Sequence, residues 1–294
     1  MKWIKRIFLS PDEPRLRAGW RLLLHTVMLF LLLGGAQFLV FPQLQSLHGE
    51  PLFFALQVVQ LIAFTLSVYL ARRLLDRRSF VSLGLAADRE MWRELGLGIL
   101  ITGVMMGLIY LLEWAAGWLT FQGFAWQFDA PAQVWRGVGW MALIFLLVGW
   151  SEELLSRGYH LQTIASGLNM TWGVVLSASV FGLLHLGNPN ATWVSAAGIF
   201  LAGVFLAYGY VRTGRLWLPI GLHIGWNFFE GVVFGFPVSG LDIYRLTRIT
   251  VNGPELFTGG AFGPEAGLIQ LPSMALGFFL IWWITRRRAE GDKE

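Results

Sequence analysis

Residues 158–211 read GYHLQTIASGLNMTWGVVLSASVFGLLHLGNPNATWVSAAGIFLAGVFLAYGYV and contain no Lys, Arg, Asp or Glu. A helix needs about 20 mostly apolar residues to cross the hydrocarbon core of a bilayer, so this stretch is long enough for two helices. The sequence GNPN at 187–190 divides it, because proline lacks a backbone donor and restricts the residue before it. The stretch therefore predicts two successive membrane-spanning helices.

The rest of the chain has the same character. Of its 294 residues, 55% are hydrophobic and 14% are charged, whereas a soluble globular protein is about one quarter charged. The 22 basic and 18 acidic residues leave a formal charge of +4, which is too small to indicate nucleic-acid binding. The absence of Cys excludes disulfides, thiolate metal sites and a cysteine nucleophile. We therefore expect neither a water-soluble enzyme nor a nucleic-acid-binding protein.

Apolar segments of spanning length recur along the whole chain. We expect an all-α, polytopic integral membrane protein whose roughly eight transmembrane helices form one bundle. The expected spans are 20–41, 52–71, 95–119, 134–157, 170–186, 192–211, 216–234 and 268–285. Residues 1–294 are expected to form a single membrane domain, with a basic interfacial arm at 1–19 and an extracytoplasmic surface loop at 235–267.

The distribution of Lys and Arg predicts the orientation of the chain, because cytoplasmic loops carry an excess of basic residues. With a cytoplasmic N-terminus and eight alternating spans, nineteen of the 22 basic residues fall on the cytoplasmic side. They are Lys2, Lys5, Arg6, Arg15, Arg17, Arg21, Arg72, Arg73, Arg77, Arg78, Arg89, Arg93, Arg157, Arg212, Arg215, Arg286, Arg287, Arg288 and Lys293. Arg136, Arg245 and Arg248 fall on the other side. Both termini are therefore predicted to be cytoplasmic.

Ionisable residues within the expected spans are the candidate functional residues. Each costs about 2.5–3.5 kcal/mol in a membrane on insertion scales, so its presence calls for a reason. They are His25, Glu113, Glu152, Glu153, Arg157, His185, His223 and Glu230. Most of them fall into three short motifs, which are Glu-Glu-x-x-x-Arg at 152–157, Phe-x-x-x-His at 181–185 and His-x-x-x-Asn at 223–227.

Helix geometry gives each motif a defined face. Glu153 and Arg157 are four residues apart and can pair, which leaves Glu152 free to point elsewhere. Each motif alone also fits a purely structural role, such as an ion pair at a helix end or polar bonds between helices. Together the motifs supply a general base, a proton partner and donors for an oxyanion, and they also resemble zinc ligands. The residues alone leave water activation and a proton or ion pathway as alternatives.

The three motifs, in this order and on successive predicted helices, resemble those of the CPBP family of intramembrane proteases. This family, also called Abi, comprises CAAX proteases and bacteriocin-processing proteins and includes the Ras-converting CaaX endopeptidase. The similarity extends to His-Leu-Gly-Asn-Pro at 185–189 and Leu-Trp-Leu-Pro at 216–219. The resemblance implies a catalytic core at 145–240 and a CaaX-protease-like endopeptidase that uses a water activated by glutamate and histidine.

The resemblance also implies a role for each motif residue. The implied catalytic residues are Glu152, Glu153, Arg157, His185, His223 and Asn227. Glu152 would be the base that activates the water, with His185 as its partner. His223 and Asn227 would stabilise the oxyanion, and the remaining two residues would support them. The sequence lacks His-Glu-x-x-His, the stronger zinc signature, so we expect no obligatory cofactor, while a divalent metal such as Zn²⁺ stays an open alternative.

The expected partners are a membrane-associated peptide or protein substrate and the lipid bilayer, without nucleic acid. The resemblance is closest to bacterial members, which predicts a location in a bacterial cytoplasmic (inner) membrane. Two other functions stay open. One is a proton-coupled transporter with Glu113, Glu152, Glu153 and Glu230 as relays. The other is a non-catalytic bacteriocin-immunity or peptide-binding membrane protein.

The depths at which the motif residues are expected to lie in the membrane conflict with a single shared site. At about 1.5 Å per residue, Glu152 lies about 22 Å along the fourth span from Gly137, in the cytoplasmic half. His223, about 10 Å into the seventh span, agrees with this depth. His185 lies about 22 Å into the fifth span, which places it in the outer half. A dip of residues 158–170 into the membrane before the fifth helix would remove the conflict.

Overall fold

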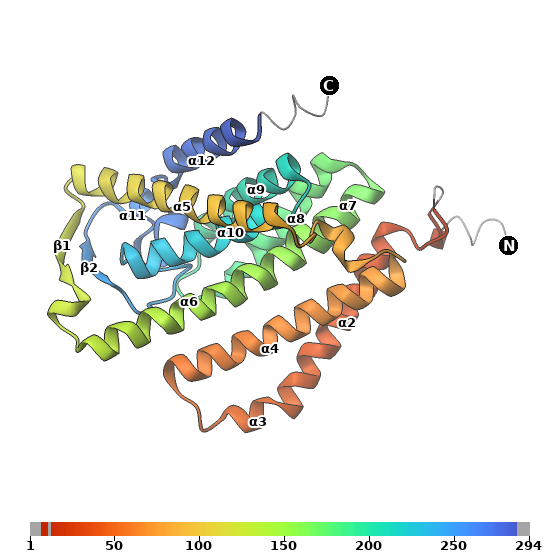
Figure 1. Cartoon of the computed structure of the whole chain (residues 1–294), viewed down its shortest axis with the longest axis horizontal. Helices are drawn as coiled ribbons and strands as arrows, with labels where there is room; N and C mark the ends of the chain where they lie inside the picture. Colours follow the sequence, from red (N-terminus) through yellow and green to blue (C-terminus); the bar gives the residue numbers. More distant parts are fainter. Residues whose placement is uncertain (1–6, 11–12, 287–294) are drawn as a thin grey trace.

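The computed structural model describes residues 7–10 and 13–286. Part of the predicted basic arm and six basic residues of the predicted cytoplasmic set lie outside these ranges, namely Lys2, Lys5, Arg6, Arg287, Arg288 and Lys293. The described chain is a bundle of helices with one pair of short strands at one end (Figure 1). Six of its helices are long and apolar enough to cross a membrane. The prediction of an all-α polytopic membrane protein is therefore confirmed.

The long helices coincide with the first six predicted spans. They are α2 (Ala18–Leu39), α4 with η1 (Gly49–Leu75), α5 (Arg89–Ala115), the continuous α6–η4–α7 (Pro131–Gly167), α8 with η5 (Met170–Gly187) and α9 (Trp193–Thr213). The seventh and eighth spans correspond to α10 (Trp217–Asn227) with the π-helical η6 (Phe228–Val233), and to the shorter α12 (Gln270–Thr285). Short helices connect these elements: α3 (Phe41–Leu44), η2 (Phe80–Leu83), η3 (Ala125–Gln127), α11 (Glu255–Thr258), η7 (Gly260–Phe262) and η8 (Pro264–Ala266). The number of eight crossings stays a prediction.

Helix α10 lies in the middle of the bundle and carries the third motif (Figure 1). Every residue from Leu218 to Asn227 is buried. The helix packs most extensively against α5, where glycines allow the backbones to approach closely. A Cβ atom on Gly98 would lie only 2.5 Å from the backbone nitrogen of Leu222. Small residues at such contacts are typical of membrane helices, because lipid gives them no hydrophobic reason to associate.

The helix that carries Glu152 is longer than the predicted span 134–157. It continues to Gly167, and the ion pair between Glu153 and Arg157 is buried inside the protein and does not need to reach water. The chain then reverses, and α8 begins at Met170. The number of residues from Glu152 to Gly167, where α7 ends, equals the number from Met170, where α8 begins, to His185. This hairpin of nearly equal arms brings the two side chains to the same level.

Two short strands lie at the end of the bundle opposite α7 (Figure 1). Strand β1 (Leu119–Phe124) pairs in antiparallel register with β2 (Thr247–Val251). The pairing shifts between Phe121 and Gly123, where the register is irregular. These strands were not predicted, because both lie in segments expected to be connecting loops. They tie the connection between α5 and α6 to the long loop that follows η6.

That long loop, residues 235–267, folds back onto the helices. Phe236, Val238 and Phe262 are buried, with exposures of 1%, 3% and 2%. Asn188, at the end of η5, donates a hydrogen bond from Nδ2 to the backbone oxygen of Ser239 at 3.1 Å. Parts of the loop therefore pack against the helices, whereas residues 254–257 are exposed.

Candidate active site

A cavity of about 440 Å³ lies within the bundle. Helices α4, α6, α8, α9 and α10 line it together with the loop after η6. Its polar lining residues are Gln57, Gln60, Glu152, Ser156, His185, Asn188, His223, Trp226, Asn227, Ser239 and Glu265. Most other lining residues are apolar and include Phe53, Phe64, Phe145, Phe181 and Phe205. A largely apolar cavity with a few converging polar groups is typical of a ligand-binding or active site.

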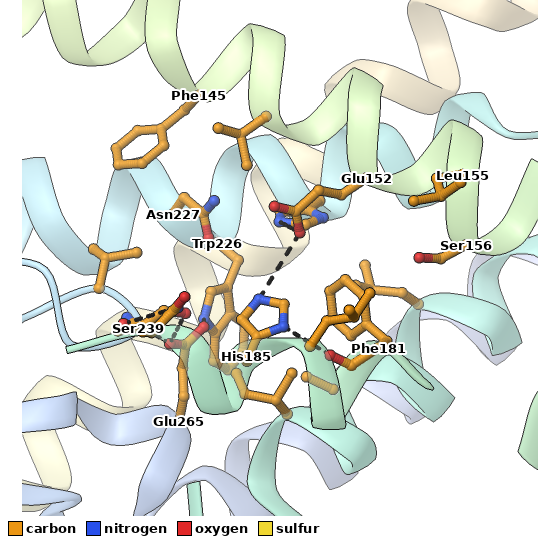
Figure 2. Close-up of a pocket in the computed structure, with 18 of the residues that line it drawn as sticks. Phe145, Glu152, Leu155, Ser156, Phe181, His185, Trp226, Asn227, Ser239 and Glu265 are labelled. Atoms are coloured by element: carbon orange, nitrogen blue, oxygen red, sulfur yellow. Dashed lines mark hydrogen bonds and ion pairs between the residues drawn. The ribbon is translucent and has the colours of Figure 1, made fainter. Parts of the chain in front are cut away.

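Four of the six predicted site residues, Glu152, His185, His223 and Asn227, line this cavity. Oε2 of Glu152 lies 3.9 Å from Nε2 of His185 (Figure 2). The same oxygen lies 3.8 Å from Nε2 of His223. These distances are too long for direct hydrogen bonds, and Oε2 of Glu152 is buried without a hydrogen-bond partner. Polar atoms separated in this way are commonly bridged by water.

The ring of His185 is oriented by Phe181, the first residue of the same motif. Nδ1 of His185 lies 2.8 Å from the backbone oxygen of Phe181, and the two ring centroids are 4.6 Å apart. Because a carbonyl oxygen only accepts hydrogen bonds, Nδ1 carries the proton and donates it. Nε2 of the neutral ring is then an acceptor, and it is the atom that lies nearest to Glu152.

The other two predicted residues, Glu153 and Arg157, lie behind the cavity wall. Both are buried, with exposures of 0% and 1%. Oε1 of Glu153 accepts a hydrogen bond from Nη1 of Arg157 at 2.7 Å and lies 2.8 Å from Nδ1 of His223. Arg157 also donates from Nη2 to the backbone oxygen of Gly203 at 2.9 Å and lies over the Phe181 ring at 4.4 Å. This pair therefore connects the helices that carry all three motifs.

The structure adds Glu265, a cavity residue that no motif predicts. It lies in η8, in the long loop, and its Oε1 accepts a hydrogen bond from Nε1 of Trp226 at 3.1 Å. Its Oε2 accepts from the backbone N and from Oγ of Ser239, at 2.8 and 2.6 Å (Figure 2). Burial raises the pKa of Glu265, and the hydrogen bonds from Ser239 oppose that rise. The signal in the sequence is that Glu265 is a lone acidic residue in the uncharged segment 256–285.

Other ionisable residues of the predicted spans lie outside the described cavity lining. Glu113, near the end of α5, and Glu230, in η6, are completely buried. His25 is also completely buried, and its Nε2 lies 3.3 Å from Oγ of Ser67 on α4. These residues therefore do not share the site of Glu152.

A structural or catalytic zinc site needs at least three protein ligands around one point. Among residues 7–10 and 13–286, no group of three or more His, Asp or Glu side chains is arranged to hold a metal ion. The residues that converge on Oε2 of Glu152 therefore do not fit a metal in this arrangement.

The fold and the cavity define a class of protein, an integral membrane protein whose helices bring Glu and His side chains together around one cavity. Residues 134–229, which contain all three motifs, match the model of a family described as type II CAAX prenyl endopeptidase Rce1-like. This match supports the resemblance of the three motifs to the CAAX proteases of the CPBP family. Neither a curated protein nor a solved structure matches the chain.

Proposed function

We propose that the protein is an intramembrane endopeptidase in which Glu152 activates a water molecule to hydrolyse a peptide bond. The proposal rests on the convergence of Glu152, His185 and His223 on one gap inside the cavity. The family match supports peptide hydrolysis as the reaction. The site supplies a base and a proton partner around one gap, which suits direct attack by water.

In the proposed mechanism, the water lies between Oε2 of Glu152 and Nε2 of His185, both free to accept its protons. As the water oxygen bonds to the carbonyl carbon, one proton passes to Glu152. Collapse of the tetrahedral intermediate breaks the C–N bond, and this proton moves to the leaving nitrogen. The other product is a carboxylic acid that keeps the water oxygen and the second proton, and it releases this proton to the amine or to water to become a carboxylate. His185 stabilises the water and the transferred proton during both steps.

The oxyanion of the intermediate would be stabilised from α10. Asn227 and His223 lie one turn apart on this helix, and both line the cavity. Asn227 can donate from its amide, and His223 can donate from Nε2 when its ring carries a second proton. The carboxylate of Glu153 at Nδ1 offsets the positive charge of that ring. Donors fixed on a buried helix need little reorganisation when charge develops on the substrate.

The substrate would be a membrane-associated peptide or protein. The matched family is described as prenyl endopeptidases, and the phenylalanine-rich lining of this cavity suits apolar side chains or a lipid chain. The predominance of basic residues on one predicted side supports cytoplasmic termini. We place the protein in a bacterial cytoplasmic membrane with this orientation.

The test is peptide hydrolysis by the purified protein in proteoliposomes, with Glu152→Gln and His185→Ala as variants. Candidate substrates are found by comparing membrane peptides of cells that carry the wild type or Glu152→Gln. Loss of the base is expected to lower kcat by about 10²–10⁴-fold. Glu113→Gln is the matched control, because it neutralises a buried carboxyl outside the cavity lining. Cleavage that is unchanged in both Glu152→Gln and His185→Ala would contradict the proposal.

The same experiment separates the other two functions. A proton-coupled transporter would show a flux sensitive to Glu113→Gln or Glu230→Gln without peptide cleavage. A non-catalytic peptide-binding protein would bind a peptide and protect cells, and Glu152→Gln would retain both properties. Of the four carboxyl groups predicted as relays, only Glu152 is among the described residues that line the cavity. The structure therefore favours hydrolysis at Glu152 over a chain of relays.

A further inference from the structure

Glu265 contributes to the cavity wall from the loop rather than from a transmembrane helix (Figure 2). It is 4% exposed and lines the same cavity as Glu152. Its backbone oxygen accepts a hydrogen bond from Nε2 of Gln270 at 2.7 Å. The same oxygen contacts α9 so closely at Gly198 that a Cβ there would clash with it. The fold therefore holds this carboxyl group in a defined place on the loop side of the cavity.

The lining of the cavity includes carboxyl groups but neither Lys nor Arg among the described residues. Its polar lining holds two carboxyl groups, those of Glu152 and Glu265, in addition to the two motif histidines. None of the described residues that line it is Lys or Arg. Arg157 lies behind the wall, where its guanidinium is bonded to Glu153. A negatively charged group on a bound peptide would thus meet carboxylates without a fixed cation, whereas a positive group would be attracted.

The carboxyl group of Glu265 has room for a further donor. Each carboxylate oxygen offers two acceptor positions. Oε2 uses both with Ser239, whereas Oε1 receives one hydrogen bond, from Trp226.

We propose that Glu265 is the specificity-determining residue of the site and binds a Lys or Arg side chain of the peptide substrate. This inference rests on the endopeptidase function proposed above. Lys and Arg can bury their methylene stems along apolar walls while the charged head reaches a polar partner. The phenylalanines that line the cavity offer such walls. The substrate class is therefore a membrane-associated peptide with a basic residue near the bond that Glu152 hydrolyses.

The test uses membrane-anchored peptides in which a single Lys is moved through the positions on either side of the cleaved bond. Each Lys peptide is compared with matched peptides that carry acetyl-lysine, Gln or Glu. The wild type is expected to cleave the best Lys peptide about 10–100-fold more efficiently, as kcat/KM, than its acetyl-lysine match. Acetyl-lysine keeps the stem and removes the charge, so this comparison needs no variant protein.

The variant Glu265→Gln removes the charge and keeps an oxygen that can accept from Ser239. It is expected to cleave the Gln peptide and to reduce the preference for Lys over acetyl-lysine to within about threefold. Glu255→Gln, an exposed residue of the same loop, is the matched control and should keep the wild-type preference. Equal cleavage of Lys, acetyl-lysine and Glu peptides by the wild type would overturn the inference while leaving the endopeptidase intact. Absence of any cleavage that depends on Glu152 would overturn both proposals.

Discussion

Nδ1 of His223 lies 2.8 Å from Oε1 of Glu153, the same oxygen that accepts a hydrogen bond from Arg157. This contact fixes the orientation of the His223 ring, so that its Nε2 faces Glu152 at 3.8 Å. Glu153 does not line the cavity and cannot touch a substrate there. We therefore expect Glu153 to act through His223 as a positioning residue.

Glu153→Gln is expected to affect both stability and turnover. The buried Arg157 would lose its charged partner, and breaking a buried ion pair costs about 3–5 kcal/mol of unfolding free energy. The His223 ring would also lose the carboxylate that orients it, so kcat is expected to fall by about 10²-fold or more with a smaller change in KM. Unfolding can be followed through the intrinsic fluorescence of the 15 Trp residues, and kcat and KM through peptide cleavage.

The matched control is Glu152→Gln, one residue earlier on the same helix. Its Oε2 has no hydrogen-bond partner, so this variant should lose activity with a Tm close to that of the wild type. If Tm falls equally in the two variants, the ion pair of Glu153 does not make this residue more important for stability than Glu152. A normal kcat in folded Glu153→Gln would rule out the positioning role.

Local features of the site could be predicted from the sequence, because they depend on helix periodicity. The pairing of Glu153 with Arg157 follows from their spacing of four residues and is present at 2.7 Å. The convergence of Glu152, His185 and His223 depends on three different helices, so spacing alone could not establish it. The resemblance of the motifs implied it, and the structure places these side chains around one gap.

What could not be predicted depends on tertiary packing. The fourth helix was expected to end after Arg157 because charges normally mark a return to water, but the bundle satisfies those charges internally. This extension to Gly167 is what brings Glu152 level with His185. Glu265 has no helical periodicity around it, and only the folding of the loop places it in the cavity. The pairing of β1 with β2 is likewise a long-range contact between two segments expected to be loops.

Gly198→Ala is expected to disturb the docking of the loop. The added Cβ would clash with the backbone oxygen of Glu265 and come within 2.7 Å of Nε2 of Gln270. Overpacking at such a contact costs about 1–3 kcal/mol, which should appear as a lower Tm. Gly96→Ala on α5 is the control, because no atom lies within 4 Å of its Cβ position, and it should be neutral or slightly stabilising. A Tm of Gly198→Ala equal to that of the control would contradict the tight contact.

Asp76→Asn is expected to destabilise the end of the bundle near the N-terminal arm. The buried carboxylate of Asp76 pairs with Arg21, with Arg72 at 3.0 Å and with Arg15 at 3.8 Å. Its neutralisation would leave three buried guanidinium groups without the carboxylate that they share, which is expected to lower the free energy of unfolding by about 3–5 kcal/mol. Thermal unfolding of the variant measures the loss. Asp242→Asn, whose side chain is 85% exposed in its pair with Arg245, should leave Tm nearly unchanged.

Asp88→Asn is expected to remove a pH-dependent part of the stability. Two hydrogen bonds from Arg215 lower the pKa of Asp88 below its usual value of 3.8. Because the folded protein favours the ionised form, this contribution is present above that usual value and disappears as pH falls through the lower, folded-state pKa. Asn also caps helices well, so the variant should keep the cap that Asp88 provides to Met91 at the start of α5. The wild type should therefore have the higher Tm at about pH 7, and the difference should narrow as pH approaches about 3. A difference in Tm that is constant over this range would show that the Asp88 charge does not contribute.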